Sequence, residues 1–220
     1  MRRARLLSLL VLMACSRGVY AELGAPHGQA TAPASARGVN GAGNPRVLIT
    51  TALGDIEVEL EPTRASETVA NFLKYVDGAF YNGGSFHRTV RADNQPTDTI
   101  RIAVVQGGMN PERRADRFPP IALERTSVTG IRHVAGAISM ARGAPDSASS
   151  DFFICLDDTP ALDFGGMRNP DGQGFAAFGR VVRGLDVVRR IQTAPANAQQ
   201  LTPAIPIITM ARVSPGIPQF

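Results

Sequence analysis

The sequence predicts a mainly β domain whose antiparallel sheet closes into a barrel. Only two segments have the apolar periodicity of a helix, whereas short segments typical of strands recur along the chain. The turns between these segments are rich in glycine, which makes up 22 of the 220 residues. Because an open sheet leaves exposed edges that invite aggregation, closure into a barrel is the arrangement that we expect.

The first two predicted strands form a hairpin. Residues 46–52 are apolar and rich in threonine, and a Leu-Gly turn follows them. In 55–61, acidic residues alternate strictly with Ile56, Val58 and Leu60. Strict alternation is typical of a strand that buries one face and exposes the other.

Two segments predict helices. Ser66 can cap the first helix, and Gly78 ends it. Its apolar residues follow the i, i+3, i+4, i+7 spacing of a single helix face: Val69, Phe72, Leu73 and Val76. The second helix is shorter and is marked by Leu185, Val188 and Ile191. The remaining predicted strands are 85–89, 101–106, 134–140, 152–156, 175–182 and 205–213.

Residues 1–21 predict a secretory signal peptide. They have a basic start, a short apolar stretch and a small-residue cleavage site that ends at Ala21. The residues up to Cys15 also resemble a lipoprotein box, in which Cys15 would carry a lipid and begin the mature protein. An uncleaved anchor is a further alternative, although the apolar run is short for a transmembrane helix. We expect an exported protein, periplasmic or attached to the envelope.

The rest of the chain divides into a tether and one folded domain. Residues 22–45 are mostly Gly, Ala, Pro, Ser and Thr and contain no aromatic residue, so they cannot bury enough surface to offset the entropy lost on ordering. We expect a flexible tether there and a folded, monomeric domain over 46–214.

Charge and cysteine content exclude several classes of function. Four of the 23 Lys and Arg residues lie in 1–21, and the remaining 19 equal the 19 acidic residues, so we expect no nucleic-acid partner. Beyond Cys15 the chain has a single cysteine, Cys155, which cannot form a disulfide framework or a cysteine-rich zinc site. No phosphate-binding glycine loop and no hydrolase motif occurs.

Three motifs carry the chemistry, and together they resemble a known family. They are Phe86-His87-Arg88, Gln106-Gly107-Gly108, and Ser139-Met140-Ala141-Arg142 running on to Phe152-Phe153-Ile154. In this order and spacing the sequence resembles the cyclophilins, which are peptidyl-prolyl cis-trans isomerases. The resemblance covers about 46–213. It implies an eight-stranded antiparallel barrel capped by two α-helices, with proline-containing polypeptides as substrates and with no cofactor and no metal.

The resemblance also implies a site built around Arg88. This residue matches the family's catalytic arginine, and Gln106 matches the glutamine that holds the substrate backbone and braces the arginine. The other implied substrate-binding residues are Phe86, Val104, Ala141, Arg142, Phe153, Leu162 and Phe175. Plain core packing is the alternative for the apolar residues. We interpret His87, His133 and Cys155 as structural.

The chemistry requires a fixed hydrogen-bond donor and no covalent step. Amide resonance gives rotation about an X–Pro bond a barrier of about 18–20 kcal/mol. In the twisted transition state the proline nitrogen regains its lone pair. A guanidinium that donates to this lone pair stabilises the transition state selectively, because the ground-state amide nitrogen offers no such acceptor.

The sequence departs from the family pattern in several places. The interval between Arg88 and Gln106 is longer than usual, and its polar segment around 91–98 predicts a loop near the site. Arg142 stands where the family has Asn, and Asp151 where it has Gln; smaller or different side chains also stand at Ala103, Val104, Ala161 and Phe175. The predicted pocket is therefore remodelled and wider.

Two other functions stay open at this stage. A domain of the same fold could bind proline-containing segments as a chaperone or scaffold with little catalysis. An unrelated β-barrel could carry a small ligand, although it would need neither Arg88 nor the ordered motifs.

Overall fold

The computed structural model describes residues 43–214, and the domain's first strand begins at Arg46. The predicted signal peptide, the alternative lipid site at Cys15 and all but the end of the predicted tether lie outside the described residues.

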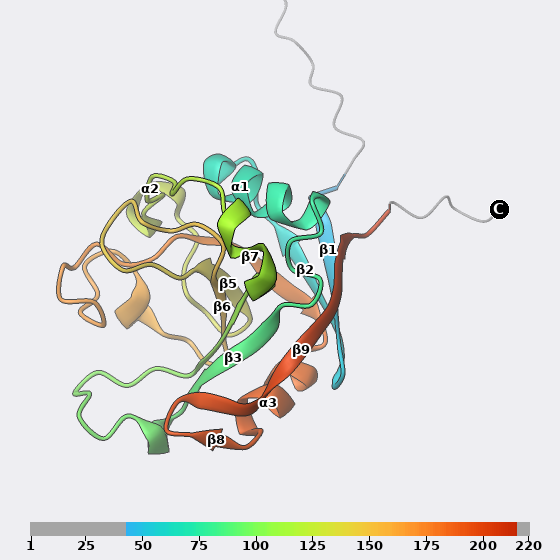
Figure 1. Cartoon of the computed structure of the whole chain (residues 1–220). Helices are drawn as coiled ribbons and strands as arrows, with labels where there is room; N and C mark the ends of the chain where they lie inside the picture. The colour runs from blue at the N-terminus through green and yellow to red at the C-terminus, as the bar shows by residue number, and fades with distance from the viewer. Residues whose placement is uncertain (1–42, 215–220) are drawn as a thin grey trace, which may run out of the picture. The chain divides into compact units, whose positions relative to one another are not determined.

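Eight strands form a closed antiparallel barrel (Figure 1). Their order around the barrel is β1 (Arg46–Thr51), β2 (Gly54–Leu60), β7 (Ala177–Arg183), β5 (Ala137–Met140), β6 (Phe152–Cys155), β4 (Val104–Gly108), β3 (Ser85–Val90) and β9 (Gln200–Arg212). Antiparallel pairing of β1 with β9 closes the ring. A two-residue strand, β8 (Ala196–Asn197), pairs with the start of β9 outside the ring. The predicted fold class is confirmed.

Helices cover the two ends of the barrel. Figure 1 shows α1 (Ser66–Asp77) at the upper end and α3 (Leu185–Thr193) at the lower end. Both predicted helices are thus present. The sequence did not anticipate the single turn α2 (Thr126–Thr129), nor the 3-10 turns Ala92–Asn94, Pro111–Asp116 and Pro160–Leu162.

The barrel wall separates two apolar clusters. The larger fills the interior, where α1 packs on the sheet and aromatic rings meet at centroid distances of 5.0–5.9 Å. The smaller lies on the outer side of β3, β4 and β6 and consists of Val90, Ile102, Val104, Ala137, Phe153, Cys155 and Leu162. Successive strand residues point to opposite sides, so each of these strands contributes to both clusters. Cys155 is fully buried in the smaller cluster, and burial raises the pKa of its thiol far above the ordinary value, which makes it unreactive.

The start of α1 differs from the prediction. Ala65 holds the N-cap position and Ser66 is the first helical residue, with no side-chain cap. The carboxylate of Glu124 takes that role, because it accepts hydrogen bonds from the backbone N–H groups of Glu67 (3.2 Å) and Thr68 (2.8 Å). A carboxylate at a helix N-terminus is also favoured by the helix dipole.

Three predicted strands begin later than expected, and β9 begins earlier. The segment before β4 bonds to a side chain instead of a strand, since Gln95 accepts from the N–H of Ile102 and donates to its carbonyl. The segment before β5 is a turn closed by the hydrogen bond from Ala137 N to the Val134 carbonyl. His133, which directly precedes the predicted strand 134–140, lies in a loop.

Candidate active site

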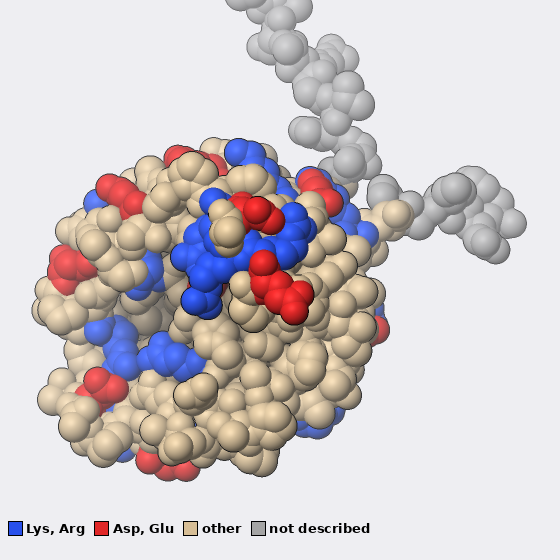
Figure 2. Space-filling view, viewed as in Figure 1, with Lys and Arg blue, Asp and Glu red and all other residues tan. Residues whose placement is uncertain are grey.

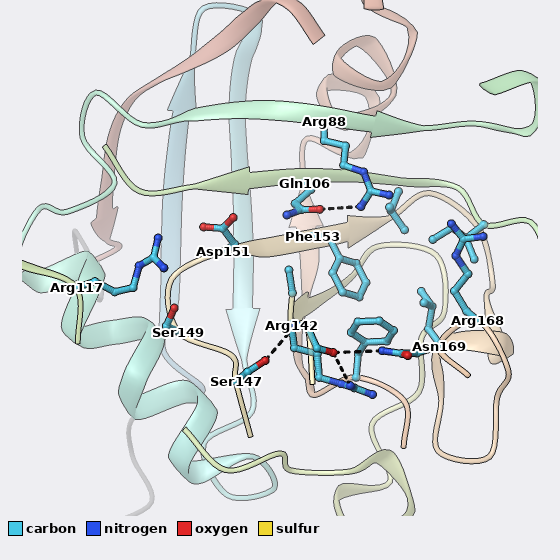
Figure 3. Close-up of a pocket in the computed structure, with 16 residues that line it drawn as sticks. Arg88, Gln106, Arg117, Arg142, Ser147, Ser149, Asp151, Phe153, Arg168 and Asn169 are labelled. Atoms are coloured by element: carbon cyan, nitrogen blue, oxygen red, sulfur yellow. Dashed lines mark hydrogen bonds between the residues drawn. The ribbon is translucent and has the colours of Figure 1, made fainter. Parts of the chain in front are cut away.

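A cavity of ≈430 Å³ lies against the outer face of the barrel, over the smaller apolar cluster (Figure 3). Residues from β3, β4 and β6, from the loop that follows β5 and from the segment that precedes β7 line it. Eight of the nine predicted site residues are among them: Arg88, Val104, Gln106, Ala141, Arg142, Phe153, Leu162 and Phe175. The fold therefore brings together side chains that are up to 87 positions apart in the sequence.

A β-bulge aims Arg88 at this cavity. In the β3–β4 ladder, Phe86 pairs with Gly107 and Arg88 pairs with Gln106, so His87 is an extra residue on β3. Residues two apart in a regular strand share a face, and a bulge changes this. Phe86 consequently points into the barrel while Arg88 points outward, beside Gln106.

The Arg88 guanidinium is held by two glutamine side chains. Its Nη1 donates to Oε1 of Gln106 at 3.0 Å, and Figure 3 shows the two side chains meeting across neighbouring strands. Its Nε and Nη2 both donate to Oε1 of Gln199, at 3.0 and 2.6 Å. Burial lowers the pKa of Arg88, as does the nearby Arg168, while Asp98 raises it in part. Arginine still stays protonated at neutral pH because its pKa starts so high.

Phe153 forms the apolar floor of the cavity. The ring is 5% exposed, stacks on His133 (centroids 5.9 Å apart, planes at 15°) and meets Phe175 edge-on at 5.5 Å. Leu162 and Val104 complete the floor and are 1% and 3% exposed. An apolar floor of this size fits a small ring, and Arg88 stands at its rim.

Buried hydrogen bonds fix the imidazole ring of His133, which lies beneath Phe153. His133 Nδ1 lies 2.7 Å from Asp163 Oδ1, and Nε2 lies 2.9 Å from Ser139 Oγ. Burial raises the pKa of Asp163, but hydrogen bonds from His133 and Arg132 lower it by more, so that the net pKa lies below its usual range. Asp163 is therefore a carboxylate at neutral pH and accepts the Nδ1–H of the imidazole. This supports the structural interpretation of His133.

Comparison with known proteins identifies the family. The sequence model described as cyclophilin type peptidyl-prolyl cis-trans isomerase/CLD matches residues 46–212. The chain belongs to the cyclophilin-type peptidyl-prolyl cis-trans isomerases. It is thus an enzyme of the class that interconverts the cis and trans forms of X–Pro bonds.

Individual relatives agree with this assignment. Peptidyl-prolyl cis-trans isomerase A of Dickeya dadantii is 37% identical over 168 residues, which cover 74% of this chain and 80% of that protein. A peptidyl-prolyl cis-trans isomerase of Acinetobacter baylyi is 32% identical over 164 residues, with the same two coverages. The crystal structure of a cyclophilin type isomerase from Cryptosporidium parvum matches with a TM-score of 0.63 at 20% identity, over 78% of this chain and 99% of that one, and so shares the fold.

Phe86 is the one predicted site residue of this cyclophilin that does not line the cavity. Its side chain is fully buried in the barrel interior, where its ring meets Phe152 edge-on at 5.7 Å. The bulge at His87 is the physical reason, because it turns Phe86 and Arg88 to opposite faces of β3. The structure thus places Phe86 in the core, the alternative that the sequence left open for the apolar residues.

The side chain of Arg142 forms its ion pair and hydrogen bonds with other residues of this chain. It is 1% exposed, pairs with Asp171 at 2.6 Å and donates to the carbonyls of Gly143 and Gly174. It also lies over the ring of Phe175, 4.9 Å from the centroid. Hydrogen bonds from Arg142 and from the backbone N–H of Gln173 lower the pKa of Asp171 to about 2. Arg142 therefore stiffens the cavity wall, and its backbone is the part that a peptide could reach.

The cavity has a polar end that the motifs did not reveal. Arg117, Ser147, Ser149 and Asp151 line it, and Figure 3 shows Arg117 and Asp151 on the side away from Arg168. Ile102, Gly143, Arg168 and Asn169 also line the cavity and were not predicted. These residues lie in loops outside the motifs or between the two halves of the third motif. Only Asp151, which stands where the family has Gln, carried a signal in the sequence.

The polar segment 91–98 lies beside the site without lining the cavity. Near its middle the backbone carbonyl of Asn94 accepts a hydrogen bond from Gln199 Nε2 at 3.1 Å. At its end Asp98 forms an ion pair with Arg168 at 2.9 Å. The segment thus contacts two side chains that themselves lie next to Arg88.

Within 43–214, no cluster of His, Cys, Asp and Glu could hold a metal ion. No helix in this part of the chain is both long enough and apolar enough to cross a membrane.

Proposed function

We propose that Arg88 acts directly on the reacting nitrogen while this cyclophilin isomerises X–Pro bonds. The substrate proline would rest on the floor made by Phe153, Leu162 and Val104. The guanidinium at the rim of this floor would then donate a hydrogen bond to the proline nitrogen as the amide twists and its lone pair reappears. The observation that carries the proposal is the fixed position of Arg88 above a closed apolar floor.

Gln106 has a second task in this proposal. Its Oε1 accepts from Arg88, while its Nε2 makes no hydrogen bond within the described residues. That N–H₂ group is therefore available to a carbonyl of the substrate backbone. One amide would then hold both the catalytic guanidinium and the peptide in register.

The arginine contribution can be measured with a matched pair of variants. A hydrogen bond from a charged donor contributes about 1.5–3 kcal/mol, so Arg88→Ala is expected to lower kcat/KM by at least about ten-fold. Arg101→Ala is the control, because Arg101 is exposed and does not line the cavity. The measurement is a protease-free cis-to-trans assay on a proline peptide. Full activity in a folded Arg88→Ala protein would refute the proposed role of Arg88, whereas a folded wild type without isomerase activity would favour a binding module.

We also propose that the enzyme acts on polypeptides outside the cytoplasm. The support is the leader-like sequence of 1–21. Mass spectrometry of the protein from its native source tests this. A mature N-terminus after Ala21, or a lipid-modified Cys15, is the expected result, and an N-terminus at Met1 would contradict it.

A further inference from the structure

Arg88 uses three of its five N–H groups before any substrate arrives. Gln199 accepts two of them on the edge formed by Nε and Nη2, and Gln106 accepts one from Nη1. A guanidinium has one N–H on Nε and two on each Nη. Among residues 43–214, no acceptor takes the remaining N–H on each Nη, and the two glutamines fix the direction in which these groups point.

Gln199 comes from the turn between β8 and β9, 111 positions after Arg88. Its backbone carbonyl accepts from Thr89 N at 2.8 Å, which ties the turn to β3 next to the arginine. The turn is tight, because Ala198 has a φ of +51°. The Gln199 side chain is thereby delivered beside Arg88 by backbone contacts.

The polar segment 91–98 fixes the other end of the Gln199 amide. Gln199 Nε2 donates to the carbonyl of Asn94, and the Asn94 side chain donates to the carbonyls of Thr89 and Ala198, each at 3.0 Å. The Asn94 side chain also accepts from Arg91 N at 2.7 Å. Both polar atoms of the Gln199 amide are therefore in use.

Arg88 needs such restraint because another cation is near. Arg168 lies close enough to disfavour the charged form of Arg88, and its ion pair with Asp98 offsets this only in part. A long side chain with a like charge beside it would otherwise populate several rotamers. The Gln199 oxygen, which accepts from Nε and Nη2, limits the Arg88 side chain to one rotamer.

We propose that Gln199 is a positioning residue for Arg88 and that the 91–98 segment anchors Gln199 through Asn94. This inference rests on the proposed role of Arg88 in isomerisation. It gives the longer Arg88–Gln106 interval of this chain a role in the reaction, although no residue of 91–98 lines the cavity.

The main test replaces Gln199 with Met, which has a similar shape and no amide. If Arg88 must be held in one rotamer, Gln199→Met lowers kcat about five-fold and leaves KM within about two-fold. Gln200→Met is the matched control: it makes the same change one position along, and the Gln200 side chain forms no hydrogen bond within 43–214. Asn94→Ala is expected to lower kcat in the same direction by a smaller factor, because it removes the anchor and leaves Gln199 in place.

A spectroscopic readout separates positioning from a general loss of stability. The Nε–H signal of Arg88 in an ¹⁵N-correlated NMR spectrum, assigned by its disappearance in Arg88→Ala, should exchange slowly in the wild type. It should broaden or vanish in Gln199→Met and persist in Gln200→Met. A persistent, unshifted signal in Gln199→Met together with unchanged kcat would overturn the inference.

A double variant distinguishes this inference from the proposed function itself. Adding Gln199→Met to Arg88→Ala should lower kcat no further, because Gln199 acts through the arginine. If Arg88→Ala is fully active, the proposed mechanism fails. If Arg88→Ala is impaired and Gln199→Met is not, only the positioning role fails.

Discussion

Phe152 and Phe153 are neighbours on β6 that face opposite sides of the barrel wall, and this makes them a matched pair for testing the site. Phe153 is the floor of the cavity, whereas Phe152 is fully buried in the interior. Changing each in turn to Leu makes the same chemical change at adjacent positions. We expect Phe153→Leu to weaken substrate binding and Phe152→Leu to affect stability alone.

The stability costs follow from the ring contacts. Phe153 has two ring partners, His133 and Phe175, and one side already faces the cavity. Phe152 meets three rings edge-on at 5.5–5.9 Å, those of Phe72, Tyr81 and Phe86. Aromatic pairs contribute about 0.5–1.5 kcal/mol each, so the free energy of unfolding should fall by about 1–2 kcal/mol for Phe153→Leu and about 2–3 kcal/mol for Phe152→Leu.

The binding cost follows from the size of a proline ring. Burying such a ring yields about 1–3 kcal/mol, and losing the flat platform beneath it should forfeit about 1 kcal/mol. That corresponds to a rise in KM of about five-fold, since 1.4 kcal/mol is a factor of ten. We expect kcat to change much less, because Arg88 and its two glutamine partners are untouched.

Steady-state isomerisation over a range of peptide concentrations measures KM and kcat, and urea denaturation measures the free energy of unfolding. The reasoning fails if Phe153→Leu leaves KM unchanged. It also fails if Phe152→Leu raises KM as much as Phe153→Leu does, since the floor would then have no special place in binding.

Two further predictions concern stability. Glu124→Ala removes the acceptor for the N–H groups of Glu67 and Thr68 and should lower the free energy of unfolding by about 1 kcal/mol in urea denaturation; no change would show that water replaces the cap. The hydrogen bond from Arg142 lowers the pKa of Asp171 to about 2. The contribution of ionised Asp171 to the free energy of unfolding is therefore fully present above the unfolded pKa of about 3.9, and it is lost as pH falls toward 2. The stability difference between the wild type and Asp171→Asn should therefore be larger at pH 5 than at pH 3, and a constant difference would contradict this.

The sequence by itself determined the fold class and named eight of the residues that line the cavity. The alternation in 55–61 and the helical spacing after Ser66 are local patterns. They can be read from neighbouring residues alone, without knowledge of the tertiary contacts. Arg88, Gln106 and Phe153 sit in ordered motifs, and motif order is a property of the chain alone. The structure places these three residues together as the resemblance implied.

Only the tertiary structure decided which way some side chains point and which distant residues meet. The bulge at His87 sends Phe86 into the core, although a regular strand would have kept it on the same face as Arg88. Gln199 reaches Arg88 and Glu124 reaches the first turn of α1 across long sequence separations. Such contacts depend on strand register and on how the barrel closes, and neither leaves a periodic trace in the sequence.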